Sequence, residues 1–363
     1  MADVELRSDT FTQPTPAMLS AMTRAPLGDD VYGEDPTVRL LEEKAAEILG
    51  KEAGCLMPSG TMANLASLTA HAPRGSRIFV ARDSDIYTYE AHGVSVCSGV
   101  ALDPVDTDAR GLLDQAQMER LLPEDNDDPQ FSVPAAVSLE NTANRAGGIP
   151  LTAHEVADTA FFAERNGLSF HIDGARIFNA AVALGVSPAE LTRPADSVQF
   201  CLSKGLSAPI GSMVVGRAEF ITRVRRVRKM LGGGMRQAGV IAAAGVVALD
   251  TMIDRLAEDH AHASMFAEGL AGIDGISVVP VACRTNIVMF QVTDPALPHE
   301  RFIDLLAARG IRLAELGRGQ IRAVTHRHVT SRDIATTLAA AEEIMREHRA
   351  ARGLATAVQG GLS

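Results

Sequence analysis

The sequence predicts an α/β fold in which a mostly parallel sheet is flanked by helices, with a smaller C-terminal α/β domain. Between residues 53 and 230, apolar stretches of strand length alternate with amphipathic stretches of helical period. Parallel strands need long crossover connections, which are usually helices, so this alternation is typical of a parallel sheet. The chain has 363 residues, of which 46% are hydrophobic, and this length favours one large and one smaller domain.

Composition argues against several classes of protein. The formal charge of −11 is spread without long runs of one sign, which argues against a nucleic-acid-binding surface. No stretch approaches about 18 uninterrupted apolar residues and no signal peptide is seen, so we expect a cytoplasmic protein rather than a membrane or secreted one. The cysteines lack the spacing of a zinc site or a disulfide framework, so we expect no metal; they are Cys55, Cys97, Cys201 and Cys283.

The N-terminal part of the chain is expected to form an extended arm and two helices. Residues 6–16 are polar and contain prolines, which suits an arm that leads into a helix at 17–24. Arms of this kind often cross onto a partner subunit. A second helix is expected at 38–49, where Asp35 provides the N-cap and Pro36 the first helical residue.

The larger domain is expected at 1–250, the smaller at 251–352 and a disordered tail at 353–363. In the larger domain the expected strands are 53–57, 76–81, 100–105, 135–139, 168–172, 197–202 and 210–215, and the expected helices are 62–72, 86–92, 112–122, 154–166, 218–230 and 239–248. A helical stretch at 249–272 leads to the smaller domain, with strands at 276–281, 286–291, 311–313 and 320–324 and helices at 299–309 and 331–350.

A turn of small residues separates the first of these strands from the helix after it. The turn Pro58-Ser59-Gly60-Thr61 lies at the helix N-terminus, where free backbone N–H groups and the helix dipole attract an anion. We therefore expect a phosphate group to bind here. The alternative is an ordinary Ser or Thr helix N-cap.

Two charged side chains stand where strands end. The strand at 168–172 is followed by Asp173, and the strand at 197–202 is followed closely by Lys204. The carboxyl ends of strands in an open α/β sheet border the ligand-binding crevice, so both side chains are expected there. Pyridoxal 5′-phosphate (PLP) requires a lysine for its Schiff base and an acid beside its pyridinium nitrogen. The pattern therefore predicts a PLP site, and the alternative is a buried Lys–Asp pair at the end of the sheet.

These motifs occur together, and in the same order, in one known family. The runs are 6–10 (LRSDT), 29–37 (DDVYGEDPT), 58–64 (PSGTMAN), 140–142 (ENT), 173–176 (DGAR), 202–206 (LSKGL), 229–237 (KMLGGGMRQ) and 322–326 (RAVTH). Through them the chain resembles the low-specificity L-threonine aldolases of the β-eliminating lyase family.

The resemblance implies a PLP-dependent transferase-like fold (fold type I) and a homotetramer, built as a dimer of dimers, with active sites at the dimer interfaces. It also implies a role for each matching residue. Lys204 is the Schiff-base lysine and Asp173 pairs with the pyridinium nitrogen, so both are catalytic. The cofactor phosphate is bound by Ser59, Gly60 and Thr61.

Further residues are implied at the substrate. Arg176 and Arg322 lie where the family holds the substrate carboxylate and cofactor oxygens, with Ser8 assisting. Planar guanidinium groups suit a carboxylate, although Arg322 taken alone, without the resemblance, is better explained by a surface ion pair. Tyr32, at the substrate, and Arg236, at the cofactor, are expected from the neighbouring subunit.

Two positions depart from the family's pattern. Asp85 stands where members usually have a histidine that stacks on the cofactor ring, and Ala143 stands where they have a second histidine near the substrate hydroxyl. Asp85 is a candidate base for the hydroxyl proton, or a ligand for a water or a substrate cation. Alternatively it N-caps the helix that follows it. His92, seven residues on, shares a face of that helix with Asp85 or is simply exposed.

The resemblance implies cleavage of β-hydroxy-α-amino acids, of the L-threonine or L-allo-threonine type, to glycine and an aldehyde. Because of Asp85 and Ala143 we expect an altered side-chain specificity. Two alternatives remain open. One is another PLP reaction at Cα, such as that of an amino-acid racemase or a β-eliminating lyase, which needs no base for a β-hydroxyl group. The other is a catalytically inactive relative that binds a partner.

Overall fold

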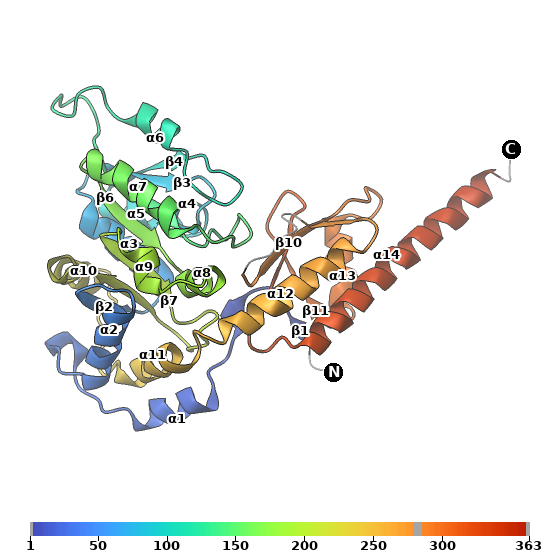
Figure 1. Cartoon of the computed structure of the whole chain (residues 1–363), viewed down its shortest axis with the longest axis horizontal. Helices are drawn as coiled ribbons and strands as arrows, with labels where there is room; N and C mark the ends of the chain where they lie inside the picture. The colour runs from blue at the N-terminus through green and yellow to red at the C-terminus, as the bar shows by residue number, and fades with distance from the viewer. Residues whose placement is uncertain (1–2, 279–284, 361–363) are drawn as a thin grey trace. The chain divides into compact units, whose positions relative to one another are not determined.

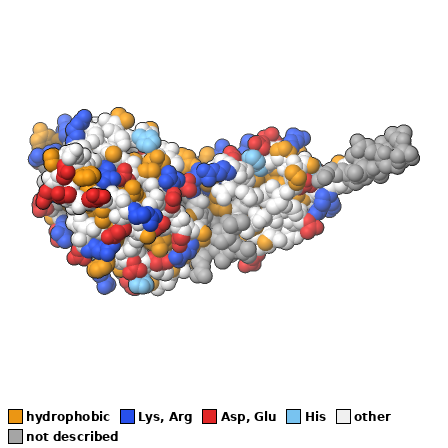
Figure 2. All heavy atoms as spheres, turned by 90° about the horizontal axis from the view of Figure 1, so that it is seen from above, with side chains coloured by type: hydrophobic (Ala, Val, Ile, Leu, Met, Phe, Trp, Pro, Cys, Tyr) orange, Lys and Arg blue, Asp and Glu red, His pale blue; other side chains and the backbone are white. Residues whose placement is uncertain are grey.

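The computed structural model describes residues 3–278 and 285–360, with the backbone alone for 352–360. The chain divides into two compact units. The larger is Thr12–Leu256, and the smaller combines the chain up to Phe11 with the chain from Ala257 onward. No helix among the described residues is long and apolar enough to cross a membrane. On the face in Figure 2, acidic and basic side chains are interspersed.

The larger unit contains a seven-stranded sheet (Figure 1). In chain order its strands are β2 (Ala53–Met57), β3 (Arg77–Ala81), β4 (Ala101–Val105), β5 (Pro134–Glu140), β6 (Ser169–Asp173), β7 (Ser197–Cys201) and β8 (Ser212–Gly216). Their spatial order is β2-β8-β7-β6-β5-β3-β4, and all neighbours from β7 to β4 are parallel. Strand β8 is antiparallel to β7 and β2, because the short link after β7 leaves no room for a crossover helix. The predicted mostly parallel sheet is confirmed.

Helices cover both faces of this sheet. In β3, Phe79 packs into one apolar cluster, and its neighbours Ile78 and Val80 pack into another, because successive strand residues point to opposite faces. The first cluster takes residues from α1 (Pro16–Arg24), α2 (Pro36–Ile48), α6 (Gln115–Leu121), α7 (Ala153–Arg165), α8 (Ile177–Leu184), α9 (Pro188–Thr192) and α11 (Gly239–Thr251). The opposite face is covered by α3 (Gly60–His71), α4 (Asp85–Thr88), α5 (Gly93–Ser98) and α10 (Ala218–Met230).

The start of α2 follows the sequence prediction. Asp35 Oδ1 accepts hydrogen bonds from the backbone N–H groups of Thr37 and Val38 at 3.1 and 3.0 Å, and Pro36 is the first helical residue. A carboxylate N-cap both satisfies free N–H groups and interacts favourably with the helix dipole. Asp35 Oδ2 also accepts from Gly239 N at 2.9 Å, so the cap ties α2 to α11.

The prediction of a helix at 86–92 is wrong at the C-terminal end. Helix α4 stops at Thr88, and Ala91 and His92 have φ angles of 53° and 51°. Left-handed residues cannot continue a right-handed helix, so a new helix, α5, begins at Gly93. His92 therefore does not share a helix with Asp85; it is exposed and its ring lies edge-on to Tyr87.

The smaller unit has a four-stranded antiparallel sheet in the order β12-β13-β10-β9, together with a parallel pair, β1 and β11. Its elements are β1 (Val4–Glu5), α12 (Leu256–Ala271), β9 (Ile276–Val278), β10 (Ile287–Val292), α13 (His299–Ala307), β11 (Ile311–Arg312), β12 (Ala314–Glu315), β13 (Ile321–Val324) and α14 (Ser331–Gly360). The remainder of the strand predicted at 276–281, and Cys283, lie outside the described residues.

Both ends of the chain differ from the sequence prediction. The sequence predicts that the first residues belong to the larger domain as an arm, but β1 pairs with β11 of the smaller unit and Leu6 is fully buried in that unit's apolar cluster. At the other end, α14 runs to Gly360 through most of the tail predicted at 353–363. Alanine and leucine in this segment favour a helix, which the polar character of the last residues obscures.

Candidate active site

The carboxyl ends of β6 and β7 and the N-terminus of α3 border one cavity of about 200 Å³. Six residues selected from the sequence line it: Ser59, Gly60, Thr61, Asp85, Asp173 and Lys204. The expected meeting of the aspartate and the lysine at the end of the sheet is therefore seen.

The turn before α3 presents backbone to this cavity. Ser59 is the N-cap of α3, and its Oγ accepts from Met62 N at 3.1 Å, so the ordinary capping interaction is present. The first N–H groups of the helix have no acceptor within the helix. A Cβ atom on Gly60 would lie 2.9 Å from Cys201 Sγ, so glycine lets this turn approach β7 closely. The turn fits an anionic group such as a phosphate.

Asp173 is buried and held by three donors. Asn64 Nδ2 donates to its Oδ2 at 2.8 Å, while Ala175 N, at 3.1 Å, and Gln199 Nε2 donate to its Oδ1. Burial raises the pKa of the Asp173 carboxyl, the nearby Asp85 adds to the rise, and Lys204 opposes it. The other end of the Gln199 amide, Oε1, is buried without a hydrogen-bond partner among the described residues. A fixed acid and an unsatisfied acceptor at the sheet end suit a cofactor with a ring nitrogen and polar substituents.

Two further carboxyl groups lie near Asp173: Glu90 lines the same cavity, and Glu140 lines a neighbouring one. Burial, with a contribution from Asp173, raises the pKa of Glu90 to about 8. Burial and the nearby Asp85 raise the pKa of Glu140 well above its ordinary value. Glu90 is therefore largely neutral at pH 7, and both shifts favour the protonated carboxyl group, which limits the negative charge around Lys204. Among the described residues no group of three or more His, Cys, Asp or Glu is arranged to hold a metal ion.

Asp85 faces the cavity and does not cap α4. Ser84 is the N-cap, since its Oγ accepts from Tyr87 N at 3.3 Å, and Asp85 is the first helical residue. The alternative that Asp85 is the N-cap is therefore wrong. Instead, Asp85 Oδ1 accepts from Asn144 Nδ2 at 3.1 Å. This leaves an acceptor carboxylate at the cavity that holds Lys204.

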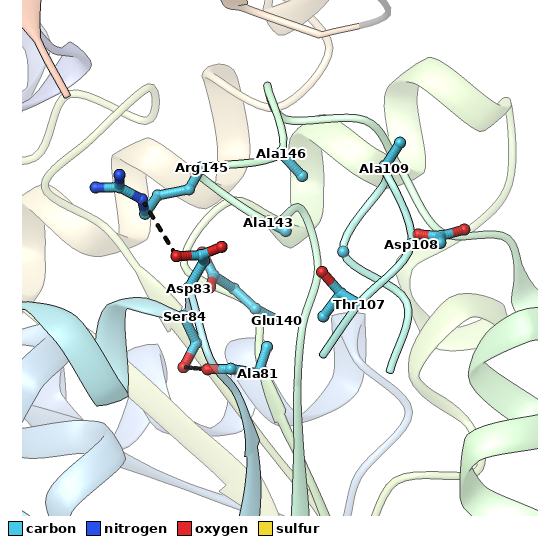
Figure 3. A pocket seen from close by; sticks show the side chains of 11 residues that line it. Ala81, Asp83, Ser84, Thr107, Asp108, Ala109, Glu140, Ala143, Arg145 and Ala146 are labelled. Atoms are coloured by element: carbon cyan, nitrogen blue, oxygen red, sulfur yellow. Dashed lines mark hydrogen bonds and ion pairs between the residues drawn. The ribbon is translucent and has the colours of Figure 1, made fainter. Parts of the chain in front are cut away.

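A second cavity of about 260 Å³ adjoins Ser84 and Glu140 (Figure 3). Ala143 lines this cavity rather than the first one. Figure 3 shows Arg145 on one side of it, where its Nε lies 3.8 Å from Asp83 Oδ1. Arg145 Nη1 also donates to Tyr89 Oη at 2.5 Å, and Tyr89 lines the first cavity. One hydrogen bond therefore links the linings of the two cavities.

Three predicted residues of the larger unit do not line the first cavity. Arg176 is buried directly after the turn that ends β6, and its neighbour Ala175 lines the cavity in its place. Tyr32 is 76% exposed, and Arg236 donates from Nη1 to Asp29 Oδ2 at 3.0 Å.

Two predicted residues belong to the smaller unit. Arg322 lies on β13, and its Nη2 donates to the carbonyl oxygen of Arg7 at 2.9 Å. Ser8 follows Arg7, and its Oγ accepts from the backbone N and the hydroxyl of Thr10 at 3.2 and 3.0 Å. Within this unit Arg322 is therefore hydrogen-bonded to the backbone of the residue that precedes Ser8.

Sequence reasoning missed three groups at the first cavity. Asn64 lies one helical turn after Gly60, and Gln199 is the cross-strand partner of Asp173, so face periodicity could have found both. Glu90 gave no such signal, because its position depends on the break between α4 and α5.

Comparison with known proteins identifies the family of this chain. Residues 5–294 match the sequence model of the beta-eliminating lyase family. Low-specificity L-threonine aldolase 1 of Arabidopsis thaliana is 42% identical over 347 residues, covering 95% of this chain and 97% of its own length. The low specificity L-threonine aldolase of Escherichia coli O157:H7 is 47% identical over 275 residues, covering 75% of this chain and 80% of its own.

The solved structure of Leishmania major threonine aldolase has a TM-score of 0.79 at 18% identity, covering 94% of this chain and 99% of its own. This likeness confirms the fold that the sequence resemblance implies. With the family match over most of its length, the chain belongs to the β-eliminating lyase family.

Proposed function

We propose that this chain cleaves β-hydroxy-α-amino acids, of the L-threonine or L-allo-threonine type, to glycine and an aldehyde, with PLP as its cofactor. One observation carries the proposal: Lys204, Asp173 and the N-terminus of α3 meet at one cavity. The chain is also 42% identical to a named threonine aldolase over nearly its whole length.

The residues of the cavity divide the binding of PLP among them. Ser59, Gly60 and Thr61 would hold its phosphate, Lys204 would bind its aldehyde carbon, and Asp173 would keep a proton on its ring nitrogen. When bound, PLP supplies an electron sink for the pair of electrons released as Cα–Cβ breaks. The protein contributes orientation and proton transfer.

Asp85 is assigned the proton transfer at the substrate hydroxyl. Its carboxylate accepts the proton of the β-hydroxyl group as the aldehyde carbonyl forms. Asn144 donates to one oxygen of Asp85 and so fixes its orientation. Glu140 Oε2 accepts from Asp85 N at 3.3 Å, and the raised pKa of Glu140 favours its protonated form, which limits the negative charge beside Asp85. In this assignment the Asp85 carboxylate takes the place of the imidazole that the family's pattern has at the same position.

The second cavity is assigned to the substituent on Cβ. Ala143 borders it with a methyl group where the family's pattern has an imidazole, so the cavity of about 260 Å³ has room for substituents larger than the methyl group of threonine. Arg176 and Arg322, with Ser8, are assigned to the substrate carboxylate, for which guanidinium groups provide paired donors.

We assign Tyr32 and Arg236 to the active site of a neighbouring chain in a homotetramer built as a dimer of dimers. Two features support this: Tyr32 is 76% exposed, and neither residue lines the cavity of its own chain. A cluster of exposed apolar side chains adjoins Tyr32 in the sequence, including Leu27 and Val31. Aromatic and apolar groups of this kind are typical of the centre of an interface.

The test is product analysis with purified protein, added PLP and L-threonine, L-allo-threonine or L-phenylserine. We expect glycine and the matching aldehyde in equal amounts. Lys204→Arg keeps the charge but should abolish both turnover and the visible absorbance of lysine-bound PLP. A D-amino acid as product would instead indicate a racemase, and pyruvate with ammonia a β-eliminating lyase. A wild-type protein that develops no visible absorbance with PLP would indicate the inactive relative.

A further inference from the structure

A row of polar side chains lies buried between the sheet and α3. His171 and Asp173 on β6 are the cross-strand partners of Ser197 and Gln199 on β7, and all four side chains are buried. Residues two apart on a strand share a face, so the four form one row. Buried polar groups are costly unless each finds a partner, so this row must be matched by the helix that covers it.

Helix α3 supplies the partners. Asn64 and His71 are seven residues apart and so lie on the same side of the helix. His71 Nε2 lies 2.7 Å from Ser197 Oγ, and Ser197 Oγ lies 2.8 Å from His171 Nδ1. His171 Nε2 lies 3.2 Å from Asn64 Oδ1, and Asn64 Nδ2 donates to Asp173 Oδ2 at 2.8 Å. An unbroken chain of hydrogen bonds therefore joins His71 to Asp173.

All the hydrogen bonds in this chain of side chains run in the same donor-to-acceptor direction. Asn64 uses both amide hydrogens on carboxyl groups, those of Asp173 and Glu90, so its Oδ1 accepts from His171 Nε2–H. Burial lowers the pKa of His171 to about 3, so this ring is neutral and its Nδ1 accepts from the hydroxyl of Ser197.

His71 is the first donor in this chain of hydrogen bonds. Burial lowers its pKa to about 4, and its neutral ring stacks on Phe220 at 4.2 Å between centroids. Because the hydroxyl hydrogen of Ser197 is donated to His171, the lone pairs of Ser197 Oγ accept from His71 Nε2–H. Each donor thus points toward Asp173, and hydrogen bonds in series polarise one another.

We propose that His71, Ser197, His171 and Asn64 form a positioning chain that holds the Asp173 carboxylate in the orientation in which it binds the ring nitrogen of PLP. The inference rests on the proposed role of Asp173. Without the chain the Asn64 amide is free to turn over, which would direct its oxygen at the Asp173 carboxylate. His71, Ser197 and His171 do not line the cavity, so they act only through Asn64.

The first test needs neither cofactor nor substrate. In the apoprotein labelled with ¹⁵N-histidine, imidazole ¹⁵N–¹H spectra should show both His71 and His171 as neutral Nε2–H tautomers. A wild-type spectrum with His171 protonated at Nδ1 would overturn the chain, and this result needs no variant to fold. Ser197→Ala should change the tautomer balance of His171.

A matched control is available on the same helix. Ser67 is buried, and its Oγ has no hydrogen-bond partner among the described residues. Ser67→Ala therefore removes a buried hydroxyl group next to the chain without breaking it, and both histidine spectra should stay as in the wild type. Equal spectral changes in Ser67→Ala and Ser197→Ala would contradict the proposal.

The second test measures PLP binding to the same proteins. Ser197→Ala should weaken PLP binding roughly tenfold, because Asn64 is then free to turn over and the charged Asp173 loses one hydrogen bond. It should also shift the absorbance of bound PLP, whereas Ser67→Ala should do neither. A purely structural role would lower thermal stability and leave affinity and absorbance unchanged, which would overturn the proposal. Wild-type protein that binds no PLP would overturn the proposed function, while the tautomers would still report on the chain itself.

Discussion

Asn144 Nδ2 donates a hydrogen bond to Asp85 Oδ1 over 3.1 Å at the boundary of the Lys204 cavity. An amide that donates to one carboxylate oxygen leaves the other oxygen available as an acceptor. Because Ser84 caps α4, the Asp85 carboxylate has no capping role that would compete with proton transfer. The pair therefore provides an oriented carboxylate, which we propose as the base, where the family's pattern has an imidazole.

The first prediction concerns this base. Asp85→Asn keeps the size of the side chain but removes its ability to accept a full proton, so kcat for aldehyde release from L-threonine should fall about 100-fold or more. Binding of PLP should change little, since Asp85 is not assigned to the phosphate or the ring nitrogen. Asp106→Asn is the control, because Asp106 is exposed in a surface pair with Arg82. Undiminished turnover in Asp85→Asn would remove Asp85 from the mechanism.

A second prediction concerns the cavity that Ala143 lines. Ala143→His places an imidazole in a space of about 260 Å³ that we assign to the Cβ substituent. The ratio of kcat/KM for L-phenylserine to that for L-threonine should fall about tenfold, because the larger substituent loses its room. The same substitution at the exposed Ala157 of α7 should leave the ratio as it is. An unchanged ratio in Ala143→His would place the substituent elsewhere.

Shared active sites predict recovery of activity in mixtures. Lys204→Ala and Arg236→Ala chains should each be nearly inactive alone. In a mixed dimer one site combines an intact Lys204 with an intact Arg236 from the other chain, so random pairing should restore about a quarter of the sites. Mixing Lys204→Ala with Asp173→Asn should restore none, because both residues line the cavity of one chain. If the first mixture also stays inactive, Arg236 serves no neighbouring site.

The last prediction is a pH dependence of stability. The pKa of Glu90 rises from 4.5 to about 8 through burial, so the folded chain holds this proton more tightly than the unfolded chain. Its contribution to stability is complete below the unfolded value and is lost as the pH rises through about 8. Glu90→Gln is neutral at every pH and avoids this loss.

Urea unfolding of the apoprotein at roughly pH 5 and pH 9 measures this effect. The free energy of unfolding of Glu90→Gln relative to the wild type should increase between the two pH values by a few kcal/mol. Glu164→Gln, at an exposed position of α7, should show no such trend. A difference between Glu90→Gln and the wild type that is equal at both pH values would show that Glu90 titrates normally.

Local sequence was enough to predict much of the structure of the larger unit. The alternation of apolar strands and amphipathic helices predicted a mostly parallel sheet, and Asp35 with Pro36 marked the start of α2. Asp173 and Lys204 were found because both follow strands whose carboxyl ends meet at one edge. Strand alternation, helix caps and residues at strand ends depend on nearby residues, so they can be read along the chain.

The sequence by itself therefore determined the sheet, the turn before α3 and the pairing of Asp173 with Lys204 at one cavity. Tertiary structure alone decided that β1 pairs with β11, that Glu90 reaches the cavity beyond the end of α4, and that burial raises the pKa of Glu90 and Glu140. It also decided that an unbroken chain of hydrogen bonds joins His71 to Asp173. The physical reason is that burial, charge state and hydrogen-bond partners depend on residues far apart in the chain, which packing brings together.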